Sequence, residues 1–179
     1  MALAPGTHKL GPDSGKLEVR TYRDGIAQKV GHDLIMDVGT WEGTVEVGGD
    51  GQPTSVTLQA DGSSLQVREG TGGVKPLSDK DKGDIRKSMD EKVLLGQPIS
   101  FRSSAVETAG GLTVRGELTI VGNERPESFE LELADDGRLT GTLPIVQSEF
   151  GIKPYKAMMG ALKVKDAVEI VLDVRLPVG

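Results

Sequence analysis

The chain has 179 residues, enough for one domain that buries roughly two thirds of its unfolded surface. It contains no cysteine and only two histidines, His8 and His32, so disulfides, cysteine nucleophiles and thiolate metal sites are excluded. The formal net charge is −6 and the basic residues are scattered, which argues against nucleic acid as a partner.

Other classes of site and segment are also disfavoured. No run of Asp and Glu has the spacing of an EF-hand, so we expect no metal. Residues 1–15 lack the charged and apolar regions of a secretory signal, so we expect a cytoplasmic protein as the sequence stands, or an exported one if a signal has been removed. No apolar stretch approaches the roughly 20 residues of a membrane helix, so no membrane span is predicted. The oligomeric state stays open.

Apolar and polar residues alternate along most of the first half, the pattern of β-strands with one apolar face. Strands are predicted at residues 16–22, 27–38, 40–47, 54–60 and 63–69. Asp24 and Gly25 form a two-residue turn signal before the second of them. In residues 27–38, His32 falls in step with Leu34 and Met36, so its ring is predicted to point the same way as the apolar side chains.

The middle of the chain changes period. Within residues 78–95, Ile85, Met89 and Val93 recur at four-residue spacing, which predicts one amphipathic helix. Ser78 is a plausible N-cap, and Asp81 three residues later makes a variant of the capping box. The single apolar stripe indicates that the helix lies against a sheet or closes one end of it.

Strands then resume, at residues 98–107, 111–122, 127–134, 138–146 and 166–177. Nearly every strand has one apolar face, which favours an antiparallel sheet with one side in water. One helix cannot cover so large a sheet, so the sheet must cover itself, and we predict an all-β antiparallel barrel of about 8–10 strands. The barrel forms a single domain over residues 1–179, with a flexible terminus at residues 1–6.

The chain has few large side chains with which to fill a barrel. Its aromatic residues are one Trp, two Tyr and three Phe. A small barrel fills its interior with side chains or encloses something else, so we predict an under-filled interior with an elongated apolar pocket. The alternative is that Leu and Val pack completely in a narrow, flattened barrel.

Several stretches, taken in order, resemble the YceI-like family of lipocalin-like barrels. They are HKLGPDSGKLEVRTY (8–22), GTWEGTVEV (39–47), GQPISFRSSAVE (96–107), LTVRGELTIVGNERPESFELEL (112–133) and QSEFGI (147–152). The resemblance spans residues 7–177, although Gln147 and Glu149 stand where the family often has arginine and aspartate.

The resemblance implies that the interior binds a long polyisoprenoid, polyprenyl or quinone-type chain, which the protein carries or sequesters without chemistry and without a cofactor. Inward positions are predicted to line the ligand: Leu17, Val19, Val30, His32, Leu34, Met36, Trp41, Val45, Leu58, Phe101, Leu118, Leu131, Leu143, Phe150 and Met158. Residues 153–164, rich in Met, are either a flexible lid over an opening or a plug at one barrel end.

Two other functions remain open. One is an enzyme that acts on an apolar substrate through His32, although Asp33 faces the opposite side of a strand and no GxSxG motif occurs. The other is a protein-interaction or stress-response domain without a ligand. His32 itself is a satisfied interior or rim residue, a hydrogen-bonding partner for a lipid head group, or a general base.

Overall fold

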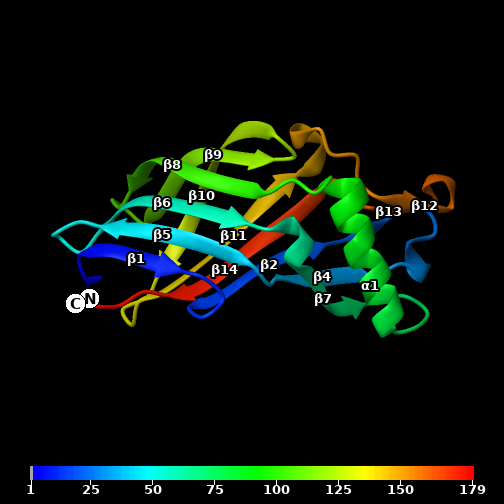
Figure 1. The fold of residues 1–179 in the computed structure, drawn as a ribbon, viewed down its shortest axis with the longest axis horizontal. Coiled ribbons are helices and arrows are strands. Elements are labelled where there is room, and N and C mark those ends of the chain that lie inside the picture. Colours follow the sequence, from blue (N-terminus) through cyan, green and yellow to red (C-terminus); the bar gives the residue numbers. More distant parts are fainter. Residues whose placement is uncertain (1) are drawn as a thin grey trace.

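A computed structural model describes residues 2–179, with the side chains of all of these except Met158. The regular structure of the chain is mostly antiparallel strands, as predicted (Figure 1). The strands are β1 (Gly6–Leu10), β2 (Gly15–Thr21), β3 (Arg23–Asp24), β4 (Asp33–Val38), β5 (Trp41–Val47), β6 (Pro53–Ala60), β7 (Leu65–Thr71), β8 (Ile99–Glu107), β9 (Leu112–Ile120), β10 (Asn123–Leu133), β11 (Arg138–Val146), β12 (Lys156–Ala157), β13 (Leu162–Val164) and β14 (Ala167–Arg175).

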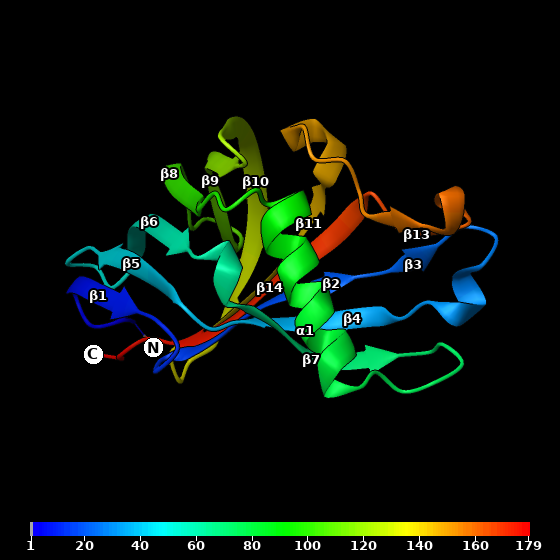
Figure 2. The same cartoon turned by 45° about the vertical axis from the view of Figure 1, so that its right-hand side comes forward.

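The large sheet contains eleven strands in the order β1-β5-β6-β8-β9-β10-β11-β14-β2-β4-β7. Some of these strands are successive parts of one long bent strand: β1 continues into β2, β4 into β5, and β6 into β7. The first parts and the second parts pair separately, since β1 pairs with β5 and β5 with β6, whereas β2 pairs with β4 and β4 with β7. The pairing of β14 with β2 brings the sheet back to its first long strand. The sheet therefore curls around an interior, and its eleven strands form eight long rows (Figures 1 and 2).

The one α-helix of the described residues lies along one end of the curled sheet, away from the two termini (Figure 2). Helix α1 spans Asp79–Ser88, and a π-helical turn, Met89–Val93, continues it. Ser78 and Asp81 form the predicted capping box, in which each side chain accepts from the backbone N–H of the other residue. Ile85 and Met89 pack against the core and Val93 is buried, so the predicted apolar stripe faces the sheet.

The prediction of one strand over residues 27–38 is wrong for its first part. Residues Gln28–Val30 form a 3-10 turn, and β4 begins only at Asp33. Gly31 packs so closely against Leu162 that a Cβ atom would lie 2.5 Å from the leucine Cδ1. The chain therefore passes close against β13 before β4 begins, a long-range contact that local alternation does not reveal.

A second, small sheet stands at the same end as α1. Its order is β12-β13-β3, and a 3-10 turn, Met158–Gly160, joins β12 to β13. Residues 153–164 are thus mainly a hairpin paired to β3.

The N-terminus, predicted to be flexible over residues 1–6, is held against the sheet where the structure describes it. Leu3 is buried, pairs with Val178, and donates its N–H to the carbonyl of Gly51. The N–H of Ala4 donates to the carbonyl of Pro177. Burial of the Leu3 side chain, together with these backbone hydrogen bonds, therefore orders the segment.

Candidate functional site

The interior of the curled sheet holds an apolar cavity of about 100 Å³. Its walls come from inward positions of nearly every strand, among them Leu17, Val45, Phe101, Leu118 and Leu131. Eight apolar side chains that face it are only partly buried, although they point away from the outer solvent: Val19, Val56, Leu58, Ile99, Phe129, Leu143, Ile170 and Leu172. The interior is therefore incompletely filled, as the scarcity of large side chains predicts.

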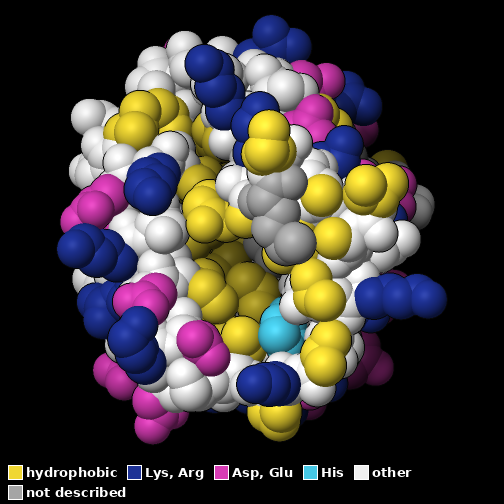
Figure 3. All heavy atoms as spheres, turned by 90° about the vertical axis from the view of Figure 1, so that its right-hand side faces the viewer, with side chains coloured by type: hydrophobic (Ala, Val, Ile, Leu, Met, Phe, Trp, Pro, Cys, Tyr) yellow, Lys and Arg dark blue, Asp and Glu magenta, His cyan; other side chains and the backbone are white. Residues whose placement is uncertain are grey.

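A second hollow, of about 270 Å³, opens at the end that carries α1, and we call it the mouth. Helix α1 and the turn after it contribute Ile85, Met89 and Val93, while Leu34, Leu162 and Val164 come from β4 and β13. Figure 3 looks at this end of the molecule and shows a hollow walled largely by hydrophobic side chains.

The structure brings most of the predicted lining residues to one of these two hollows. The interior cavity takes Leu17, Val19, Val45, Leu58, Phe101, Leu118, Leu131 and Leu143. The mouth takes Val30, His32 and Leu34. Three others, Met36, Trp41 and Phe150, are buried in the core and line neither hollow. The side chain of Met158 lies outside the described part of the chain.

Sequence reasoning missed several lining residues. Val56, Phe129, Ile170 and Leu172 face the cavity, and their place in the two-residue alternation of β6, β10 and β14 is the signal that identifies them. Ile85 and Met89 line the mouth, and the apolar stripe of the helix pointed to them.

His32 lies in the loop before β4, half-buried at the mouth, and not within a strand as predicted. Its Nε2 lies 2.7 Å from the carbonyl oxygen of Lys75. A carbonyl oxygen only accepts, so Nε2 carries the hydrogen, and in the neutral ring Nδ1 is left as an acceptor. His32 therefore ties the loop between β7 and α1 to the mouth.

Thr21 is, with Gln147, one of the two buried polar residues of the described chain that line the mouth. Its side chain lines the hollow, only 4% of the residue is exposed, and the hydroxyl has no hydrogen-bond partner among the described residues. Burial of an unsatisfied hydroxyl costs about 1–3 kcal/mol. A ligand group that hydrogen-bonds this hydroxyl would recover part of that cost.

Two charged residues of the mouth, Arg23 and Asp84, have partners. The Arg23 Nη1 donates to the carbonyl of Gly31, and its Nε lies 3.8 Å from the Asp33 carboxylate. Asp84 pairs with Lys80 at 2.9 Å. Within residues 2–179 no three His, Cys, Asp or Glu side chains gather as a metal site would need.

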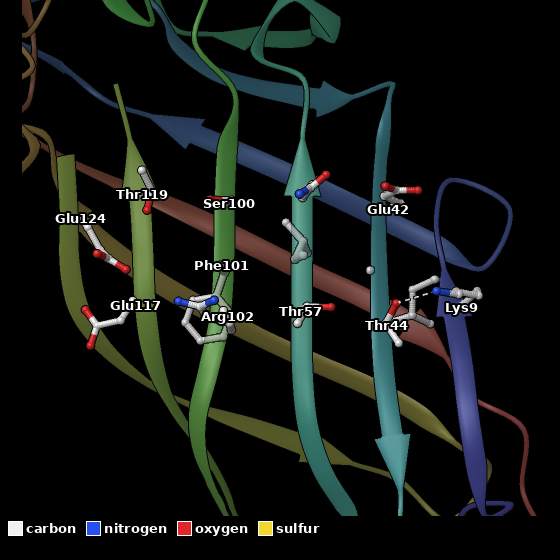
Figure 4. A pocket seen from close by; sticks show the side chains of 14 residues that line it. Lys9, Glu42, Thr44, Thr57, Ser100, Phe101, Arg102, Glu117, Thr119 and Glu124 are labelled. Atoms are coloured by element: carbon white, nitrogen blue, oxygen red, sulfur yellow. Dashed lines mark hydrogen bonds between the residues drawn. The ribbon is translucent and has the colours of Figure 1, made fainter. Parts of the chain in front are cut away.

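Another hollow, of about 640 Å³, lies on the outer face of the sheet (Figure 4). A cross-strand row runs through it, in which each residue is paired with the next: Lys9, Thr44, Thr57, Arg102 and Glu117. Lys9 donates to the Thr44 hydroxyl at 3.1 Å. Because outward residues alternate with inward ones, this polar row is the water-facing side of the strands that wall the cavity.

Comparison with solved structures identifies the same architecture elsewhere. The chain is similar to Burkholderia cenocepacia BcnA, with a TM-score of 0.63 and 20% identity over 88% of this chain and 94% of that one. A polyisoprenoid binding domain from Saccharophagus degradans, implicated in plant cell wall breakdown, matches with a TM-score of 0.55 and 10% identity over 97% and 100% of the two chains. The Campylobacter jejuni YCEI protein matches with a TM-score of 0.55 and 11% identity over 81% and 82%.

A search of the curated proteins found no match. Across residues 2–179, no helix combines the length and apolar character needed to cross a membrane. The model of the YceI-like domain family matches residues 25–176, which is most of the chain. Together with the curled antiparallel sheet and its apolar interior, this match shows that the chain belongs to the YceI-like domain family.

Proposed function

We propose that the chain binds a long apolar lipid in the interior of its curled sheet and carries or sequesters it. The observation that carries the proposal is the apolar cavity, whose inward side chains, such as Leu58, Leu143 and Ile170, are left partly uncovered. Covering apolar surface stabilises a complex by about 25 cal/mol per Å², before the costs of association. A bound lipid chain covers the parts of these side chains that the protein leaves uncovered.

The mouth fits the polar end of such a lipid. The Thr21 hydroxyl is buried without a partner, and His32 keeps Nδ1 as an acceptor in its neutral form. These groups differ from the rest of the hollow, whose other walls are largely apolar. An apolar body with a few hydrogen-bonding groups at one end is the usual arrangement of a site that orients an amphipathic ligand.

The proposed chemical class of the lipid rests on the similarity of this chain to a solved structure. The Saccharophagus degradans structure is described as a polyisoprenoid binding domain, and the two chains share the fold. A polyisoprenoid, either polyprenyl or with a quinone-type head, is therefore the ligand that we propose for this chain.

Binding fits the mouth better than catalysis does. A general base needs a free nitrogen within hydrogen-bond reach of a nucleophile. His32 keeps Nδ1 free when Nε2 donates to the Lys75 carbonyl, but the Thr21 hydroxyl at the mouth has no hydrogen bond to it or to any other described base. We therefore propose that the lipid leaves the protein chemically unchanged.

Native mass spectrometry of freshly purified protein, followed by organic extraction, tests this function. We expect a co-purifying lipid of constant mass, or saturable uptake of an added polyprenol by emptied protein. Protein that is empty and refuses both polyprenols and quinones would overturn the proposal. A consistent change in the mass of the added lipid after incubation would instead reveal an enzyme.

A further inference from the structure

Three segments form one continuous border around the mouth, and we call them the rim: residues 26–32, 72–77 and 153–165. The N–H of Ala27 donates to the carbonyl of Ala161 at 2.7 Å, which joins the first segment to the third. The hydrogen bond between His32 and Lys75 joins the first to the second. All three lie at the end of the molecule that is farthest from the termini (Figures 1 and 2).

Exposed apolar side chains are concentrated on the rim. Eight large hydrophobic side chains of the described residues are exposed, and five of them belong to these short segments: Ile26, Val30, Val74, Tyr155 and Met159. Ile26 is 95% exposed, and Met159 is fully exposed. Such a cluster is unfavourable in water and marks an interaction surface.

The backbone of Met159 holds its side chain outward at a cost. The residue has φ 57° and ψ 34°, in the left-handed region that L-residues with a side chain avoid. Nothing packs on the side chain to repay this strain, since it is fully exposed. A strained, exposed methionine at the edge of the mouth favours a contact made outside the free protein.

The rim also carries a charge opposite to that of the whole molecule. Its basic residues are six exposed lysines: Lys29, Lys75, Lys153, Lys156, Lys163 and Lys165. The same three segments contain no Asp or Glu, although the chain as a whole has a net charge of −6. None of the six lysines forms an ion pair with another described residue. Of the nearby acidic residues, Asp33 and Asp84 are paired with Arg23 and Lys80, while Asp24 lies opposite Lys163 in the small sheet and accepts from the N–H of Gly25.

We propose that the rim docks the protein onto the surface of an anionic lipid bilayer, with the mouth facing the membrane. The apolar tips enter the interface between head groups and acyl chains, while the lysines contact the anionic head groups. The geometry places the entrance of the apolar interior at the bilayer, where a long lipid can pass from one to the other without crossing water. Docking is a property of the rim itself, so it goes beyond lipid binding in the interior.

Co-sedimentation with vesicles of phosphatidylcholine, with and without phosphatidylglycerol, tests the proposal. We expect binding to the anionic vesicles, weak binding to the neutral ones, and release in high salt, because salt screens exposed charges. Each lysine near an anionic surface strengthens binding about fivefold. The double variant Lys153→Glu with Lys156→Glu should therefore bind at least about tenfold more weakly.

Control variants separate docking from general effects. Lys9→Glu with Lys16→Glu makes the same charge change on β1 and β2 and should leave binding within about twofold of that of the parent. Ile26→Ser with Met159→Ser should reduce binding several-fold, whereas Val178→Ser, beside the C-terminus, should not. Thermal unfolding and lipid retention serve as the folding and ligand readouts, so a failure of docking is distinguishable from a failure of lipid binding.

Absence of binding to anionic vesicles at low salt would overturn the proposal, as would equal losses in the rim and control variants. Size-exclusion chromatography tests whether the apolar rim instead binds a second copy of the chain. A dimer that Ile26→Ser with Met159→Ser dissociates would make the rim a dimer interface and would also overturn membrane docking.

Discussion

The Nε2 atom of His32 donates to the carbonyl oxygen of Lys75 over 2.7 Å, linking two loops that are 43 residues apart in the sequence. This bond gives the histidine a structural role at the mouth. His32→Ala should lower the free energy of unfolding by about 0.5–1.5 kcal/mol, the usual net value of one hydrogen bond. Amide hydrogen exchange in residues 72–77 should accelerate, because the loop loses its tether.

His32→Ala should still retain lipid, since the interior cavity is built from other residues, and should lose no more affinity than the one head-group hydrogen bond that Nδ1 can accept. His32→Gln, which keeps an N–H donor, should restore part of the exchange protection. If His32→Ala instead abolished turnover of an apolar substrate with fold and lipid retention intact, the enzyme alternative would hold.

Thr21→Val should change stability and binding in opposite directions. Valine has nearly the same shape as threonine but removes a buried hydroxyl without a partner, so the empty protein should become more stable by about 1 kcal/mol. Affinity for a lipid with a hydrogen-bonding head should fall about fivefold to tenfold, because the head group loses its partner. Chemical denaturation and lipid titration measure the two effects, and Thr21→Ser is the matched control because it keeps the hydroxyl. A destabilised Thr21→Val with unchanged affinity contradicts the role of this hydroxyl.

Glu18 is a buried carboxylate on the outer face of β2. It accepts from Arg68 at 2.5 Å and from Arg20 at 3.2 Å, and its side chain is only 9% exposed. Glu18→Gln leaves the arginines without this charge partner and should reduce the free energy of unfolding by about 1–3 kcal/mol. The exposed pair of Glu107 with Arg115 provides the control, since Glu107→Gln should cost less than about 1 kcal/mol. If Glu18→Gln and Glu107→Gln lowered the free energy of unfolding equally in urea denaturation, burial of Glu18 would not strengthen its ion pairs.

The hydrogen bond of Tyr22 to Glu169 should make the stability of the protein fall at alkaline pH. The hydrogen bond that its hydroxyl donates to Glu169, together with burial and the charge of that carboxylate, raises the pKa of Tyr22 above its ordinary value of 10.0. A pKa that is higher in the folded state gives a stabilisation that is complete below pH 10.0 and is lost as the pH rises through the folded value. Tyr22→Phe should remove this alkaline loss, as followed by denaturation across the alkaline range. A tyrosinate titration of folded Tyr22 below the ordinary value contradicts the assignment.

The parity of side chains was predictable because each strand has one wet face. Leu17, Val19 and Thr21 alternate along β2, and the structure places the first two in the interior and the third at the mouth. This much follows from the two-residue period alone.

A local pattern does not predict how deeply an inward side chain is buried, or where a distant contact interrupts a strand. Met36 shares the inward parity of Leu34 on β4 and Phe150 lies in a 3-10 turn, yet close packing buries both away from the two hollows. Strand pattern likewise did not reveal the turn at Gln28–Val30, which depends on the packing of Gly31 against Leu162. The missing hydrogen bond of Thr21 depends on what surrounds it in space, which no sequence period encodes.

The most direct test of lipid binding in the interior is extraction of lipid from Leu143→Trp and Thr142→Trp, purified in parallel with the parent protein. Leu143 faces the cavity, whereas its neighbour Thr142 is an exposed outward position. Tryptophan at 143 fills the space that the lipid would occupy, so Leu143→Trp should fold but retain less than about a tenth of the lipid bound by the parent, while Thr142→Trp should retain it fully. Equal lipid retention in the two folded variants would contradict lipid binding in the interior.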